Sequence, residues 1–174
     1  MLQHVYHGEN FKYDGRGSCF MFEKHKDAHV AKVAFNSIKR SDIDDTVFWI
    51  SFIHNYEWYW KDVGRGDLER RQGILKAHLS THVRTSKRIR FLRSGDAKKR
   101  RESLIELANI LGIMVAGIRY VVLKGADDRH KNFFREGMAI LIKNLRQYFP
   151  KVDLTEYRKF LQKIKDPLGL QEFL

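Results

Sequence analysis

The longest apolar run in the chain covers residues 104–123, and its pattern is typical of a buried helix. Its only charged residues are Glu106 and Arg119. Small side chains recur every four residues within it, at Ala108, Gly112 and Ala116. Such a ridge lets a second helix approach closely. The uncharged part, residues 107–118, is too short to span a bilayer. The pattern therefore predicts the buried central helix of a helical protein over residues 97–123.

Residues 41–60 predict a second strongly apolar helix. Aromatic side chains form one stripe along it, at Phe48, Phe52, Tyr56 and Tyr59. Ser41 is placed to cap this helix, and the acids that follow, Asp42, Asp44 and Asp45, suit the positive end of the helix dipole. The aromatics could instead stack on nucleic-acid bases, but little positive charge accompanies them, which favours packing in a core.

Residues 67–92 predict a helix that a tight turn connects to the central helix. Asp67 follows a glycine-rich break and suits the N-cap position. Gly95 suits the C-terminal cap of this helix, and Asp96 suits the N-cap of the next.

Three further segments complete the helical pattern. Residues 23–40 and 127–149 keep the helical period, and Asp127 or Asp128 can begin the second of them before Pro150 stops it. Residues 153–165 predict a short amphipathic helix with a capping box, in which Asp153 replaces the usual Ser or Thr and Glu156 is its partner.

Residues 11–22 predict a β-hairpin. Aromatic side chains alternate with other residues on both sides of a turn sequence, at Phe11, Tyr13, Phe20 and Phe22. The Asp14-Gly15 dipeptide within the turn tolerates the positive φ that a tight hairpin needs.

The expected fold is mainly α: a helical bundle of about four long helices, with an N-terminal β-hairpin and a short C-terminal helix. We expect one domain over residues 1–174. Residues 1–40 would form a hairpin-plus-helix appendage and residues 41–165 the bundle. The apolar tail, residues 166–174, would dock on the body or on a partner.

The composition favours a folded protein of a reducing compartment. Hydrophobic residues make up 43% of the chain, which is enough to build a core. A lone cysteine, Cys19, excludes an internal disulfide and a four-cysteine zinc site. The first residues lack a basic segment followed by an apolar run, so we expect no signal peptide. These features predict a soluble protein, cytoplasmic or otherwise intracellular.

Positive charge is concentrated in one segment. The net charge is +12, and residues 65–101 contain thirteen Lys and Arg against three acids, so that this segment alone contributes +10. Charge of one sign gathered in this way repels itself unless a partner neutralises it. The segment therefore favours binding to a polyanion over a merely solvated face.

Within this segment, two sets of cations flank the predicted turn. The first set ends one helix: Arg84, Lys87, Arg88, Arg90 and Arg93. The second set begins the next: Lys98, Lys99, Arg100 and Arg101. Four cations at a helix N-terminus oppose the helix dipole, at a cost of a few tenths to about 1 kcal/mol each when exposed. A local rule broken in this way favours a functional role, and the backbone N–H groups there would also be available to a phosphate.

We therefore expect a non-catalytic nucleic-acid-binding protein, for RNA or DNA, that contacts phosphates through residues 84–101 and needs no cofactor. An acidic protein surface or anionic lipid headgroups would satisfy the same charge. A structural or adaptor subunit is one alternative, in which the basic corner meets an acidic protein. The apolar tail and the aromatic helix would then form subunit contacts.

The spacing of the histidines suggests a metal site, but the same spacing could arise by chance. Two pairs have a spacing of four, His25 with His29 and His78 with His82, so each pair could share one helix face. Two such spacings arise easily among eight histidines, so we expect no metal.

A second alternative is catalytic. Arg71 and His78 are separated by six residues, which resembles the arginine–histidine pattern of HEPN-type helical ribonucleases. That resemblance implies a helical bundle in which the pair activates an RNA 2′-hydroxyl. The family has a characteristic polar residue straight after the arginine, and Gln72 stands at that position here, so the match is partial. It covers eight residues. Phosphate-binding glycine loops, Cys-x-x-Cys and nucleophile-elbow motifs are absent from the sequence.

Overall fold

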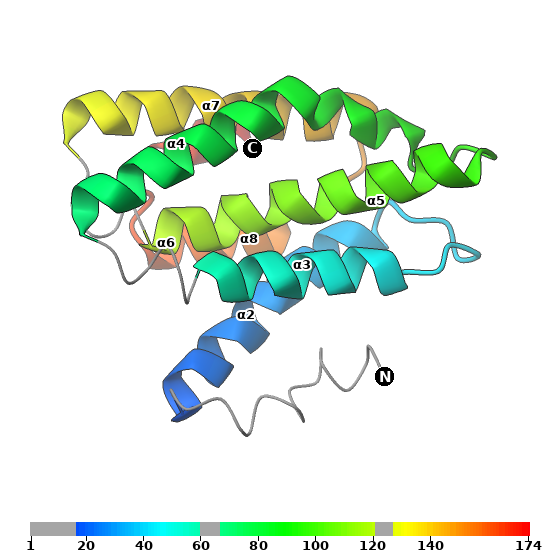
Figure 1. The fold of residues 1–174 in the computed structure, drawn as a ribbon, viewed down its shortest axis with the longest axis horizontal. Helices are drawn as coiled ribbons and strands as arrows, with labels where there is room; N and C mark the ends of the chain where they lie inside the picture. The colour runs from blue at the N-terminus through cyan, green and yellow to red at the C-terminus, as the bar shows by residue number, and fades with distance from the viewer. Residues whose placement is uncertain (1–16, 60–66, 121–126) are drawn as a thin grey trace.

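The computed structural model describes residues 17–59, 67–120 and 127–174, and in these ranges all regular elements are helical (Figure 1). The α-helices are α2 (Gly17–Asn36), α3 (Thr46–Trp58), α4 (Leu68–Thr85), α5 (Ala97–Gly112), α6 (Ile118–Tyr120), α7 (Asp128–Tyr148) and α8 (Thr155–Lys163). Two 3₁₀ helices are η3 (Ser86–Phe91) and η6 (Leu170–Phe173), and a π-helical turn, η4 (Ile113–Gly117), joins α5 to α6. The prediction of a mainly α protein is confirmed.

The α5 helix lies at the centre of the arrangement. It packs against α3 on one side and against η3 and α4 on the other (Figure 1). The α7 helix in turn packs on α4 and η3, while α2 packs against α8. This arrangement brings the longest apolar run of the sequence between two layers of helices.

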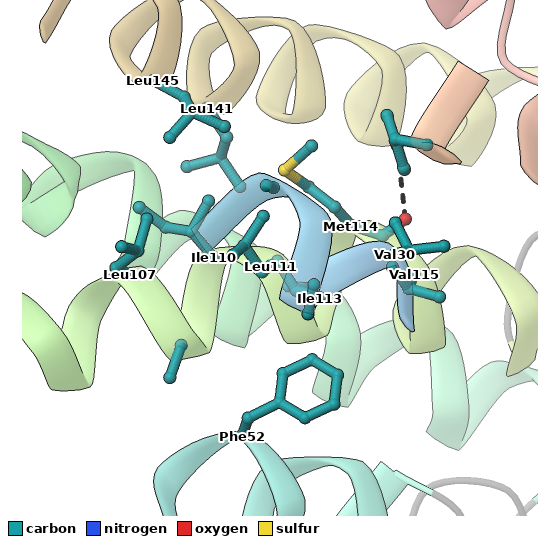
Figure 2. Close-up of a cluster of buried hydrophobic side chains, with 14 of the residues drawn as sticks. Val30, Phe52, Leu107, Ile110, Leu111, Ile113, Met114, Val115, Leu141 and Leu145 are labelled. Atoms are coloured by element: carbon teal, nitrogen blue, oxygen red, sulfur yellow. Dashed lines mark hydrogen bonds between the residues drawn. The ribbon is translucent and has the colours of Figure 1, made fainter. Parts of the chain in front are cut away.

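The prediction of a buried central helix over residues 97–123 is confirmed for residues 97–120, and residues 121–123 lie outside the described residues. Every side chain from Ile110 to Ile118 is buried. In Figure 2 the side chains of α5 lie between Phe52 of α3 and Leu141 and Leu145 of α7. In the described part of the chain, no helix has both the length and the apolar content needed to cross a membrane.

Glycines lie at two helix contacts, and one of these contacts requires glycine. A Cβ on Gly112 would meet the Cβ of Asn55 at 3.8 Å, which is ordinary van der Waals contact and fits the predicted small-residue ridge against α3. The Asn55 side-chain amide also donates to the carbonyl oxygen of the Asn109 side chain. A Cβ on Gly137 of α7 would come within 2.5 Å of Leu79 Cδ2 on α4, so only glycine fits this contact as it stands.

Three of the predicted N-caps are confirmed. The Asp67 carboxylate accepts from Arg70 N at 2.8 Å, and that of Asp127 accepts from His130 N at 3.0 Å. Asp96 Oδ1 accepts from the backbone N–H groups of the two lysines that follow it in α5. Aspartates placed directly before apolar helical patterns were therefore reliable guides to where α4, α5 and α7 begin.

The predicted β-hairpin is wrong where it can be compared with the structure. Residues 17–22 belong to α2, and residues 11–16 lie outside the described residues. The alternation of Phe20 and Phe22 covers only three residues, which is too short to distinguish a strand from a helix. Adding a turn to an existing helix is far cheaper than nucleating a new element, so the helical pattern from residue 23 extends backwards to Gly17.

Several predicted helix boundaries also need correction. Ser41 does not cap α3, which begins at Thr46 after Asp45, and residue 60 lies outside the described residues. The helix predicted over residues 67–92 changes from α to 3₁₀ geometry after Thr85. Gly95 does not have a positive φ, so it does not form the left-handed C-terminal cap that the sequence suggested.

The predicted capping box at α8 is wrong. Asp153 Oδ1 accepts from Thr155 N at 3.0 Å, the Asp153 backbone N–H donates to Ser37 Oγ at 2.9 Å, and Glu156 accepts from Lys159 Nζ at 3.1 Å. The short two-residue turn formed by the aspartate satisfies the first helical N–H without a reciprocal bond from the glutamate.

The apolar tail docks on the body of its own chain. Leu168 and Leu170 are buried, and the Arg135 guanidinium of α7 donates to the backbone oxygens of Leu168 and Gly169 at 2.7 Å each. Gly169 supplies the left-handed conformation, with φ 63°, from which η6 begins.

Candidate nucleic-acid interface

The basic corner is the region formed by η3, the turn at residues 94–96 and the first turns of α5. Figure 1 shows this turn at the end of the molecule opposite α6. Eight of the nine predicted contact residues are exposed, and Arg100 is half-buried. The exposed ones are Arg84, Lys87, Arg88, Arg90, Arg93, Lys98, Lys99 and Arg101. The structure therefore brings together the two sets of cations that the sequence places on either side of the turn.

Buried polar contacts hold η3 in place. Ser103 of α5 donates its hydroxyl to the backbone oxygen of Ile89 at 3.0 Å, and the Asn144 amide of α7 donates to Ser86 Oγ at 2.7 Å. Ile89 itself is fully buried. Polar groups buried in this way carry a cost if their partners move, so η3 presents its cations from a fixed backbone.

The ring of Phe91 joins the two sets of cations. The guanidinium carbon of Arg90 lies 4.5 Å from the ring centroid, and the Lys99 ammonium lies 5.1 Å from it. These are cation–π distances. A half-buried aromatic therefore holds one cation from η3 and one from α5 on the same surface.

Two arginines of the corner have structural contacts. Arg93 donates to the backbone oxygen of Ile38 at 2.6 and 3.2 Å and lies over Phe149. Arg100 Nη1 donates to the Ser94 backbone oxygen at 2.9 Å. Substitution of either residue would therefore disturb the fold as well as the charge.

Three backbone N–H groups at the start of α5, which the sequence left available to a phosphate, already have acceptors in the structure. Asp96 Oδ1 accepts from Lys98 N at 2.9 Å and from Lys99 N at 3.2 Å, and the Asp96 backbone oxygen accepts from Arg100 N at 3.0 Å. The Asp96 carboxylate therefore already occupies two of the N–H groups that a phosphate would need. The same carboxylate offsets the unfavourable interaction of the four following cations with the helix dipole. The groups of the corner that remain available to an anion are therefore mainly its side chains.

The fold adds neighbours to the corner that the sequence did not indicate. A cavity of about 400 Å³ lies between the α2–α3 connection and α5, and both Arg100 and Arg101 line it together with Arg40. Asp42 and Asp44 line the same cavity. Asp42 pairs with Arg40 at 3.2 Å, and a hydrogen bond from the Thr46 hydroxyl lowers the pKa of Asp44. Arg40 lies about sixty residues before Arg100 in the chain, so no local pattern could have placed it here.

Arg71 and His78, the candidate ribonuclease pair, lie two turns apart on α4. A seven-residue separation gives nearly the same direction around a helix. Arg71 Nε donates to the Asp67 backbone oxygen at 3.4 Å. The half-buried His78 ring stacks on Trp58 of α3, with centroids 4.5 Å apart. The stacking holds the His78 ring against Trp58 of α3. One face of α4 is exposed to solvent.

A buried polar cluster lies next to His78. The His82 ring is 5.8 Å from it, and His82 Nδ1 lies 3.2 Å from Glu106 Oε1 of α5. Thr85 donates its hydroxyl to the same carboxylate oxygen at 2.8 Å. Burial, together with the neighbouring His82, lowers the pKa of His78 below its ordinary value of 6.5.

This pKa shift predicts a pH dependence of stability. Because His78 binds a proton less readily in the folded state, the unfolded state takes up more protons as the pH falls below about 6.5. Stability should therefore fall with acidification, and His78→Gln should reduce that fall. Urea unfolding of both proteins near pH 7.5 and near pH 5 measures the difference. Equal losses of stability in the two proteins would contradict the assignment.

Of the four histidines of the metal-site hypothesis, the described ones do not come together in one cluster. His29 is exposed and lies 4.0 Å from Glu156 of α8, whereas His82 contacts Glu106 of α5. The His25 side chain lies outside the described residues. Among the side chains that are described, no group of three or more potential ligands lies together.

Comparison of the chain with protein-family models, with curated proteins and with solved structures finds no match.

Proposed function

We propose that this chain is a non-catalytic nucleic-acid-binding protein that contacts the phosphates of RNA or DNA through its basic corner. The observation that carries the proposal is the exposure of eight cations around one turn between η3 and α5. Among the described residues, no carboxylate side chain forms an ion pair with any of these eight cations.

The chemistry of the corner suits a phosphate backbone. Arginines outnumber lysines there, and a guanidinium presents a planar fork of donors that matches phosphate oxygens. Arg90 and Lys99 both contact the Phe91 ring, which holds these two cations close together. Contacts of this kind position a nucleic acid without reading its sequence, so the proposal is for binding in which charge dominates.

Removal of three exposed cations from the corner tests this proposal. The triple variant Lys98→Gln, Lys99→Gln, Arg101→Gln leaves the structural Arg93 and Arg100 in place. Each lost phosphate contact should reduce the slope of log K against log salt by about 0.9 for duplex DNA and about 0.7 for a single strand. We expect affinity near 100 mM salt to fall tenfold or more. Fluorescence anisotropy with labelled single- and double-stranded RNA and DNA across a salt series measures both quantities.

A matched control separates the corner from total charge. Arg129, Lys143 and Lys151 are exposed and lie outside the corner, so their replacement by glutamine removes the same charge elsewhere. This control should retain most of the affinity. Equal losses in the two variants would remove the corner from the proposal. Absence of any binding at low salt would favour the adaptor alternative, with an acidic protein as the partner.

A ribonuclease remains a second candidate because of His78. A lowered pKa keeps this imidazole neutral near pH 7, the form that a general base requires, and Arg71 lies on the same side of α4. Under this hypothesis His78→Ala should slow cleavage of labelled RNA by about 10²–10⁴-fold while binding survives. His54→Ala is the matched control, since His54 is exposed on α3. Cleavage that His78→Ala leaves unchanged would exclude this pair.

A further inference from the structure

One cavity beside the basic corner differs from the rest of the corner in its lining. It has a volume of about 400 Å³ and lies between the α2–α3 connection and the first turns of α5, which run close together in Figure 1. This volume falls within the range of about 300–1,000 Å³ that small-molecule sites occupy. Ile43, Val47 and Leu104 give the cavity an apolar part. Its charged lining consists of three arginines and two aspartates: Arg40, Arg100, Arg101, Asp42 and Asp44.

The two aspartates make this cavity a poor site for a phosphate group. Their carboxylates repel phosphate oxygens at short range, because like charges repel. A neutral group that carries both hydrogen-bond donors and hydrogen-bond acceptors suits a lining in which arginines and aspartates are mixed. A nucleobase is such a group, and it would arrive on the same strand whose phosphates contact the corner.

Existing contacts limit which arginine can donate to a base. Arg40 Nε lies 3.2 Å from Asp42 Oδ1, and Arg100 Nη1 donates to the Ser94 backbone oxygen at 2.9 Å. Arg101 is exposed, and it forms no ion pair with any residue that the structure describes. The Arg101 guanidinium is therefore the most available donor group of the cavity.

The two carboxylates supply the acceptors of the cavity. Asp44 Oδ1 accepts from the Thr46 backbone N–H at 2.9 Å and from the Thr46 hydroxyl at 2.6 Å, and these bonds orient the carboxylate. Asp42 meets Arg40 through its Oδ1 as well. Each carboxylate has a second oxygen, Oδ2, that these contacts do not use. The cavity thus presents one available donor group beside two acceptor groups.

The apolar part of the cavity can contact the face of a base. The sequence left open that bases stack on the aromatic stripe of α3, but all four aromatic residues of that stripe are buried. Val47 is half-buried, whereas Ile43 and Leu104 are buried with little exposed surface. These three side chains are apolar groups of the cavity that would cover the flat side of a base once its edge is hydrogen-bonded.

Guanine is the base whose edge matches this arrangement. Its Watson–Crick edge carries one acceptor, O6, followed by two adjacent donors, the N1–H and the 2-amino group. Adenine, cytosine and uracil each present a single donor group on the same edge. In a duplex that edge of guanine is paired with cytosine, so only an unpaired guanine offers it to a protein.

We propose that the cavity binds an unpaired guanine of a single-stranded nucleic acid: Arg101 donates to O6, and Asp42 and Asp44 accept from the N1–H and the 2-amino group. This inference rests on the proposed function, since the phosphates beside that guanine lie on the cations of the corner. It adds recognition of one base to binding that charge otherwise dominates.

Fluorescence anisotropy of the full chain at one low salt concentration tests the base site. The probes are labelled uracil oligonucleotides with uracil, guanine, hypoxanthine, adenine or cytosine at one central position, and the matching thymine DNA strands. Guanine should raise the affinity over the all-uracil strand by about fivefold or more, as one good bidentate base contact does. Hypoxanthine lacks the 2-amino group, so it should lose most of this guanine gain. The gain should also vanish when each strand is annealed to its complement.

The outcomes separate the base site from the proposed function. A guanine gain in RNA or in DNA strands supports the base site. Equal affinities for all five central bases in both strand types, with weaker binding by the triple corner variant, would overturn the base site and leave the proposed function standing. Absence of binding to every strand would overturn both.

Asp44→Asn locates the guanine in the cavity. Asparagine keeps a side-chain oxygen for the two bonds from Thr46, but it places an amide donor where the guanine donors lie. The guanine gain should fall to about twofold or less, because a good bidentate contact is lost. Affinity for the all-uracil strand should rise, since a negative charge beside the corner is removed. An unchanged guanine gain in both Asp44→Asn and Asp42→Asn would exclude this cavity.

Two controls complete the test. Asp153→Asn changes an exposed aspartate outside the cavity that accepts from Thr155 N at 3.0 Å in a similar turn, so it should leave the guanine gain intact. The double variant Lys98→Gln, Lys99→Gln should weaken binding of all strands by a common factor and keep the gain. A gain that disappears with these lysines would assign the base preference to the corner and overturn the cavity site.

Discussion

Phe52→Ala is expected to lower the free energy of unfolding by about 3–5 kcal/mol, the usual cost of removing a buried aromatic ring. Phe52 is fully buried on α3, and its ring lies 5.7 Å from that of Trp49 and 6.3 Å from that of Phe48. Figure 2 shows it facing the apolar side chains of α5. Truncation would leave a cavity in the most extensive helix contact of the fold, and rigid neighbours on both helices would limit its collapse.

The same helix provides a matched control. The Ile50 side chain, two residues earlier, is 56% exposed. Ile50→Ala should change stability by about 0.5 kcal/mol or less, as surface substitutions usually do. Urea unfolding followed by circular dichroism measures both variants. Similar losses in the two would contradict the packing of α3 against α5.

Local signals in the sequence were sufficient for much of the fold. The aspartates at positions 67, 96 and 127 each precede an apolar helical pattern, and each caps a helix in the structure. The spacing of Ala108, Gly112 and Ala116 indicated close approach by another helix, and Asn55 of α3 lies against Gly112. These features depend on interactions within one or two turns, which a single sequence carries.

Features that depend on how helices extend or pack against one another could not be predicted from local signals in the sequence. Three residues of aromatic alternation favoured a strand at residues 20–22, but the growth of α2 from its better-formed part decides the outcome there. The change from α to 3₁₀ geometry after Thr85 accompanies the contacts of η3 with α5 and α7. Tertiary packing overrides a helical period in such places.

The same distinction between local signals and tertiary packing applies to the functional residues. The cations of the basic corner are neighbours in sequence, so the charge pattern was enough to group them. By contrast, a cavity of about 390 Å³ between α2, α6 and α8 is lined by Lys26, Arg119 and Lys163, which lie far apart in the chain and carry no shared motif. The role of Asp96 illustrates a third case, because the same residue that was a correct N-cap also occupies the N–H groups assigned to a phosphate.

Asp27→Ala is expected to cost about 3–5 kcal/mol of unfolding free energy, a second large effect with a different origin. Asp27 is 1% exposed and holds Arg119 through two charge-assisted hydrogen bonds. Its removal takes two charge-assisted hydrogen bonds from a guanidinium that is only 19% exposed and that lines the same cavity as Lys26 and Lys163. The penalty comes mainly from the buried positive charge, which then has less compensation, and less from the lost attraction.

A double-mutant cycle separates these two contributions. If the buried positive charge of Arg119 dominates, removing it as well should recover stability, so Asp27→Ala combined with Arg119→Met should be at least about 1 kcal/mol more stable than Asp27→Ala alone. Met is flexible and keeps an apolar contact with Phe160 within reach. Urea unfolding of the wild type, the two single variants and the double variant completes the cycle. Additive losses would mean that Asp27 and Arg119 contribute to the fold independently, and that Asp27 does not hold the guanidinium at the cavity.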